Sequence, residues 1–139
     1  MVDKKYIDVN VFIYWLGAHP KYGKRAKKWI KEVEKSGYGE YVTSSLTLYE
    51  IAVILSGLTG TTFRDHEFIK TVMNAINSLK SLKIISLEDN HLIDAVKLME
   101  EYKLDYEDAL HLAVALKASA EEIVTNDSDF DRTPLRRLF

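Results

Sequence analysis

Four acidic residues stand at positions of the sequence where a carboxylate is unusual. Asp8 ends a short apolar segment, YID, near the start of the chain, and Asp127 follows a second one, IVTN, near its end. Glu50 interrupts LTLYEIAVIL and Asp108 precedes ALHLAVAL, two segments that would be apolar on most sides as helices. Singly, each acid fits a simple role as a helix cap, a solvated helix residue or a turn residue. As a set they are harder to explain, because two end strands and two interrupt buried helices.

A carboxylate in an apolar environment needs a positive partner. Its desolvation is costly, and several carboxylates close together cannot all stay ionised without a cation, because their repulsion raises their pKa values. The chain has no cysteine and no paired histidines, so oxygen atoms are the expected ligands. Oxygen ligands favour a hard divalent ion, Mg²⁺ or alternatively Mn²⁺. The expected partner of Asp8 is therefore a metal ion.

Histidines offer a different chemistry. A ribonuclease that works without a metal uses general acid–base residues, most often histidines. His19, His66, His91 and His111 are spread over unrelated segments. His111 lies three residues after Asp108, within reach of it on one helix face. We expect His111 to be a buried or supporting residue rather than a catalytic one.

Alternating short apolar segments and amphipathic segments must position these residues. The pattern predicts strands at 4–8, 39–45, 83–87 and 121–127, and helices at 22–37, 46–58, 66–82, 88–104 and 105–120. A further helix follows the first strand, and Asn10 or Asp8 is its expected cap. This order indicates an α/β fold, a three-layer α/β/α sandwich around a mostly parallel sheet. Sites in such sheets lie beyond the carboxyl ends of the strands, where Asp8 and Asp127 would meet.

The segments YIDVN, SSLTLYEI, LDYEDALHLAVA and IVTNDSDF occur in this order over almost the whole chain. Together they resemble the four signature segments of PIN-domain ribonucleases, most of all the small VapC-type toxins of toxin–antitoxin pairs. The resemblance implies a PIN-like fold and an acidic metal-binding and catalytic set made of Asp8, Glu50, Asp108 and Asp127. It also implies supporting roles for Asn10 and Thr125, and for Asp129 a role shared or exchanged with Asp127.

The function implied by this resemblance is that of a metal-dependent endoribonuclease that cleaves single-stranded or loop RNA, as the toxin of a type II toxin–antitoxin system. The implied partners are RNA, a small antitoxin and a second copy in a homodimer. A PIN-like nuclease of RNA maturation or a structure-specific DNA nuclease would share the same acids. A non-catalytic nucleic-acid-binding domain or a phosphatase-like α/β domain is a further alternative, although Asn10 stands where such a phosphatase needs a second Asp.

Charge is distributed unevenly along the chain, although the net charge is only −2. Residues 21–31 contain six cations and no acid. On a helix, Lys21, Lys24, Arg25 and Lys28 would share one side, where they could guide RNA phosphates toward the acids. The arginines near the end of the sequence are weaker candidates, because terminal segments are often mobile.

Length and hydropathy complete the expectations. The 139 residues, 47% of them hydrophobic, predict one nuclease domain over 1–139. The start of the sequence, MVDKKY, lacks the long apolar region of a signal peptide, and the longest apolar stretch, VFIYWLGA, is too short to span a bilayer. We therefore expect a cytoplasmic protein without membrane contact.

Overall fold

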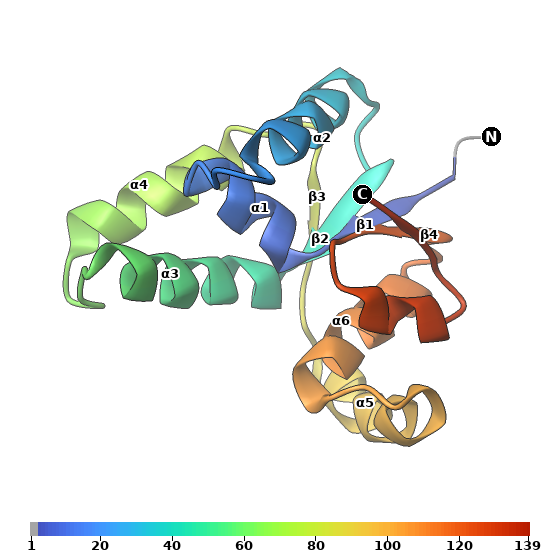
Figure 1. Cartoon of the computed structure of the whole chain (residues 1–139). Helices are drawn as coiled ribbons and strands as arrows, with labels where there is room; N and C mark the ends of the chain where they lie inside the picture. Colours follow the sequence, from blue (N-terminus) through green and yellow to red (C-terminus); the bar gives the residue numbers. More distant parts are fainter. Residues whose placement is uncertain (1–2) are drawn as a thin grey trace.

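Strands and helices alternate along the chain in the computed structural model, which describes residues 3–139 (Figure 1). The strands are β1 (Lys5–Ile7), β2 (Tyr41–Ser44), β3 (Lys83–Ile85), β4 (Glu122–Val124) and β5 (Arg136–Leu138). The α-helices are α1 (Val9–Leu16), α2 (Gly23–Lys35), α3 (Ser45–Thr59), α4 (His66–Asn77), α5 (Asp89–Tyr102) and α6 (Tyr106–Lys117), and a 3₁₀-helix, η1, spans Ser128–Arg132. Met1 and Val2, part of the segment in which no signal peptide is expected, lie outside the described residues.

The five strands form one sheet in the order β3-β2-β1-β4-β5, and every neighbouring pair is parallel. Helices α1 to α4 cover one face and α5 and α6 the other (Figure 1). Successive strand residues alternate between the two layers: Tyr6 and Ile123 pack in the cluster with α5 and α6, whereas Ile7 and Val124 pack in the cluster with α1 to α4. The predicted three-layer α/β/α fold is confirmed, with a sheet that is parallel throughout.

The junction between β1 and α1 decides between the two expected helix caps. Asp8, not Asn10, is the N-cap of α1, and its carboxylate accepts a hydrogen bond from the amide of Val9 at 2.8 Å. The helix begins directly after the strand, so only Asp8 has the extended backbone that a cap requires. Asp8 is therefore both the residue that follows β1 and the N-cap of α1.

The end of the described chain differs from the prediction. Instead of a mobile segment, Arg136–Leu138 forms β5, an edge strand paired with β4. Arg137 makes two hydrogen bonds to the carboxylate of Asp131, at 2.7 and 3.2 Å, and Arg136 lies 3.7 Å from Glu122. These arginines are engaged within the fold. No helix within residues 3–139 is long and apolar enough to cross a membrane.

Candidate active site

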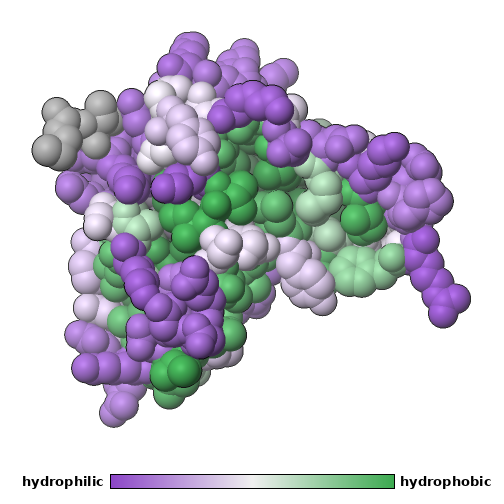
Figure 2. All heavy atoms as spheres, turned by 180° about the vertical axis from the view of Figure 1, so that it is seen from behind, coloured by the Kyte–Doolittle hydropathy of each residue, from purple (hydrophilic) through white to green (hydrophobic). Residues whose placement is uncertain are grey.

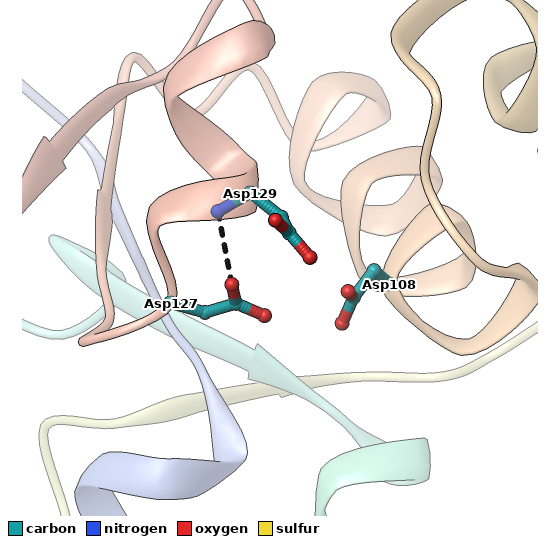
Figure 3. Close-up of side chains that lie close together, drawn as sticks. All are labelled: Asp108, Asp127 and Asp129. Atoms are coloured by element: carbon teal, nitrogen blue, oxygen red, sulfur yellow. Dashed lines mark hydrogen bonds between the residues drawn. The ribbon is translucent and has the colours of Figure 1, made fainter.

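Three aspartates converge beyond the carboxyl ends of the central strands (Figure 3). Asp108 comes from the first turn of α6, Asp127 follows β4, and Asp129 lies in η1. One carboxylate oxygen of each lies within 4.8 Å of those of the other two. Asp108 and Asp127 are partly exposed and Asp129 is exposed, so the cluster opens to solvent. We call these three residues the acidic cluster.

Local capping interactions hold the acidic cluster in place. Asp105 caps α6 and accepts a hydrogen bond from the amide of Asp108 at 2.8 Å, which fixes Asp108 in the first helical turn. Asp127 caps η1 and accepts from the amide of Asp129 at 2.9 Å. The amide of Asp127 donates to the hydroxyl of Thr125 at 3.1 Å. Each acid is therefore positioned by the start of a helix.

Asp8 lies deeper than the acidic cluster, at 4% exposure. One of its oxygens accepts hydrogen bonds from the Thr125 hydroxyl at 2.8 Å and the Asn10 amide at 3.4 Å. Burial raises the pKa of Asp8, against the lowering effects of His111 and of the hydrogen bond from Thr125. Asn10 and Thr125 thus contact Asp8 directly, as the expected supporting residues would.

Glu50 is also buried and has a specific partner. Its Oε1 lies 2.5 Å from Nε2 of His111, whose Nδ1 lies 2.7 Å from the hydroxyl of Tyr6. The Tyr6 hydroxyl in turn donates to Oγ of Ser44 at 3.0 Å. Burial lowers the pKa of His111, but Tyr6, Glu50 and Asp8 outweigh burial and raise that pKa well above its usual value. These contacts join Glu50, His111, Tyr6 and Ser44 in one buried hydrogen-bond chain.

The carboxylates at this edge of the sheet influence one another. Burial, followed by the charges of Asp105, Asp8 and Asp127, raises the pKa of Asp108 to about 7. The charge of Glu50 likewise raises the pKa of Asp8. Of the four acids predicted from the sequence, the structure brings Asp108 and Asp127 together with Asp129. Asp8 and Glu50 lie outside this group, where Asp8 bonds Thr125 and Glu50 bonds His111.

The acidic cluster fits a divalent cation. Mg²⁺–oxygen bonds of about 2.1 Å place neighbouring ligand oxygens about 3–4 Å apart, which small side-chain rotations from the observed positions would achieve. Among the described residues, Asp108 and Asp127 form no salt bridge, and Asp129 is the one member of the cluster that pairs with a cation, Arg132, at 3.2 Å. Burial and then the charges of neighbouring carboxylates raise the pKa of Asp108, and a divalent cation bound at the cluster would offset that negative charge.

The family model of the PIN domain matches residues 5–135. The chain belongs to the PIN domain family. The family resemblance predicted from the sequence is thereby confirmed, and VapC toxins are among the structural neighbours of this PIN domain.

Three solved structures show the likeness in fold of this PIN domain to toxin–antitoxin proteins. A toxin–antitoxin complex from Klebsiella pneumoniae is 21% identical, with a TM-score of 0.66 over 96% of this chain and 99% of that one. VapC20 of Mycobacterium tuberculosis, a Sarcin-Ricin loop cleaving toxin, is 16% identical, with a TM-score of 0.73 over the same shares. VapBC2 of Rickettsia felis, bound to a DNA fragment from its promoter, is 20% identical, with a TM-score of 0.66 over 96% of each chain. No curated protein matches the sequence.

Two site residues of this PIN domain make contacts that the sequence pattern does not predict. His111 is buried, as expected, but it bonds Glu50 and Tyr6 rather than Asp108. No pattern in the sequence marks Tyr6. The available signal is the need for partners: a buried imidazole and a buried phenol each require hydrogen bonds. Which partners they find depends on how β1, α3 and α6 pack, which the sequence pattern does not specify.

Proposed function

We propose that this PIN domain is a metal-dependent endoribonuclease that cleaves single-stranded or loop RNA, and the toxin of a type II toxin–antitoxin pair. The observation that carries the proposal is the convergence of Asp108, Asp127 and Asp129 beside the buried Asp8. Membership of the PIN domain family supports a nuclease, and the toxin–antitoxin proteins among the structural neighbours support a toxin.

In this proposal Asp8, Asp108 and Asp127 hold Mg²⁺, or alternatively Mn²⁺. Asp129 shares the role of Asp127, and Glu50 completes the acidic set. All donors are carboxylate oxygens, the ligands that these hard ions prefer. When bound, the ion would neutralise charge on the scissile phosphate and make an attacking water more acidic.

The neighbours of Asp8 and Glu50 keep these two carboxylates in position. Thr125 and Asn10 donate to the same oxygen of Asp8, which restrains rotation of its carboxylate. His111 bonds one oxygen of Glu50 and restrains the orientation of its carboxylate. In the proposed reaction Glu50 orients the water for in-line attack, and cleavage leaves a 3′-hydroxyl and a 5′-phosphate.

The cations on and next to helix α2 support the proposal of an RNA substrate. Lys21, Lys24, Arg25 and Lys28 are exposed on or next to this helix, and the apolar residues of the same helix face the core. A polyanion that approaches the negatively charged cluster needs positive charge nearby to hold its phosphates. We assign this role to α2.

An apolar face supports association with a second copy of the chain. Large apolar side chains remain exposed on α3 and α5 and in the loop after α3: Tyr49, Val53, Ile54, Leu58, Phe63, Leu92, Ile93 and Val96. Figure 2 shows apolar side chains reaching the surface between the arm formed by α3 and α4 and the lobe formed by α5 and α6. Exposed apolar patches of this kind mark association surfaces. We propose a homodimer through this apolar face, and a small antitoxin that covers the acidic cluster.

The test is cleavage of total cellular RNA by the purified protein, with Mg²⁺ or with excess EDTA, followed by mapping of new 5′ ends. We expect new 5′-phosphate ends only with Mg²⁺, and their loss in Asp127→Asn. Asp94→Asn, which changes an exposed acid of α5, is the matched control and should cleave normally. Equal cleavage after thorough chelation, or by Asp127→Asn, would contradict the proposal.

A further inference from the structure

Four partly exposed aromatic rings lie together next to the acidic cluster. They come from Tyr14 in α1, His19 in the following loop, Tyr22 at the start of α2 and Phe139 after β5. The rings of His19 and Tyr22 are stacked at 5.1 Å between centroids, and Tyr14 contacts them at 4.9 and 5.1 Å. Phe139 lies 5.8 Å from Tyr14 and 6.2 Å from Tyr22. We call these four residues the aromatic platform.

Asn126 connects the aromatic platform to the acidic site. Its side-chain amide donates to the hydroxyl of Tyr14 at 3.2 Å, and its backbone amide donates to Oδ1 of Asn10 at 3.4 Å. The next residue in the chain is Asp127. Because β5 runs parallel to β4, Phe139 also lies at the carboxyl edge of the sheet. The platform therefore contacts the loop that carries Asp127, and it lies at the same edge of the sheet as the acidic cluster.

Two cations accompany the aromatic platform. Nζ of Lys21 lies 5.2 Å from the ring centroid of Tyr22, and the guanidinium of Arg25 lies 5.3 Å from that of Phe139. Both side chains are exposed, and no acid occurs in residues 21–31. Aromatic faces flanked by cations are the usual surface on which single-stranded nucleic acid binds, because bases stack on the rings and phosphates meet the cations.

The loop that carries His19 is ordered by its own hydrogen bonds. Nδ1 of His19 accepts from the backbone amides of Lys21 and Tyr22, at 3.1 and 3.0 Å. The side chain of Asn126 and then Lys21 lower the pKa of the Tyr22 hydroxyl. Rings that only filled the core would be buried, whereas each of these four is partly exposed. The platform is therefore organised before any ligand arrives.

We propose that the aromatic platform binds a nucleobase of single-stranded RNA next to the phosphate that enters the acidic cluster, with Lys21 and Arg25 on the neighbouring phosphates. This inference rests on the proposed nuclease function and adds a base-binding subsite to it. Stacking needs only the flat face of a base, so the subsite favours unpaired nucleotides over duplex and tolerates different bases.

Tyr22 is the residue to change. It forms no side-chain capping bond at the start of α2, so its substitution leaves the helix end intact. Tyr22→Leu removes the aromatic face, whereas Tyr22→Phe and Tyr22→Trp keep it. Tyr38→Leu, at an exposed tyrosine beyond the other end of α2, is the matched control. Phe139→Leu tests the platform from a second element.

The binding assay uses a single-stranded oligoribonucleotide that contains 2-aminopurine, with all variants placed in the Asp127→Asn background to prevent cleavage. We expect Tyr22→Leu and Phe139→Leu to weaken binding about tenfold and to abolish the quenching that stacking causes. Tyr22→Phe, Tyr22→Trp and Tyr38→Leu should bind within about twofold of the parent. Unchanged affinity and quenching in Tyr22→Leu, or equal losses in Tyr22→Leu and Tyr22→Phe, would overturn the proposal.

Cleavage kinetics separate this inference from the nuclease proposal. In the active protein with Mg²⁺, Tyr22→Leu should raise KM about tenfold and leave kcat nearly unchanged. Cleavage with an unaltered KM in Tyr22→Leu would overturn the base-binding subsite while the nuclease proposal stands. Stacking on Tyr22 without cleavage of any RNA would support the subsite and remove the nuclease proposal.

Discussion

Acidification should weaken metal binding to the acidic cluster, because Asp108 must lose a proton to become a ligand. Burial and then the charges of Asp105, Asp8 and Asp127 raise the pKa of Asp108 to about 7. Below this pH the folded, metal-free protein carries a neutral Asp108, and an arriving cation has to displace its proton. The raised pKa therefore predicts weaker binding as the pH falls and nearly constant binding above about pH 8.

The magnitude follows from the pKa of Asp108. With a pKa of about 7, the side chain is about 90% protonated at pH 6, half protonated at pH 7 and about 10% protonated at pH 8. The apparent affinity for Mn²⁺ or Mg²⁺ should thus fall about tenfold between pH 8 and pH 6. Binding should release about 0.9, 0.5 and 0.1 protons per ion at these three pH values.

Isothermal titration calorimetry in buffers of different ionisation enthalpy measures both quantities. Asp105→Asn is the informative variant, because Asn also caps helices but carries no charge. It should keep α6 intact and move the midpoint of the pH dependence downward. Asp108→Asn should remove most of the proton release. Equal affinity at pH 6 and pH 8 in the unmodified protein, without proton release, would refute this explanation of the pKa of Asp108.

Four further outcomes are expected. Asp108→Asn should stabilise the metal-free protein by about 1 kcal/mol at pH 8 in thermal unfolding. An acid whose pKa is raised in the folded state destabilises the fold as the pH rises, so this gain in stability should fade toward about pH 4. Tyr6→Phe removes the hydroxyl at the centre of the buried hydrogen-bond chain and should lower the free energy of unfolding in urea by about 1–3 kcal/mol; an unchanged midpoint would contradict this. Reversing the charges of Lys24 and Arg25 to Glu should weaken RNA binding and flatten its salt dependence. An unaltered salt dependence would show that these two side chains are solvated surface residues that do not contact RNA. Leu58→Glu on the apolar face should convert a dimer into a monomer in sedimentation velocity, whereas a monomeric parent protein at micromolar concentration would remove the homodimer.

Local patterns predicted most of the fold. The helix expected at 22–37 is α2, and the one at 66–82 is α4 with an earlier end. After Ser78 the amides of Leu79 and Leu82 bond back three residues, to Ile76 and Leu79, instead of four, so the α-helical pattern stops. The edge strand β5 was not predicted, because three residues carry too little pattern and its strand character comes from pairing with β4. Periodicity reports which face of an element is buried, but pairing at an edge depends on the finished sheet.

The site was predictable only in part, for a similar reason. Asp8 and Asp127 stand at strand ends, and a parallel sheet brings such ends to one edge. The approach of Asp129 to Asp108 and Asp127 depends on the turn of η1, and the partner of Glu50 depends on how α3 packs against α6. Spacing along the sequence predicts which elements meet, whereas the side-chain contacts between them follow from packing.

Anomalous diffraction from crystals soaked in Mn²⁺ tests the central claim most directly. The structure predicts one strong manganese peak among the carboxylates of Asp108, Asp127 and Asp129, beside Asp8, and its disappearance in Asp127→Asn. Well-diffracting crystals with no peak at these residues, or with manganese bound only elsewhere, would contradict the account.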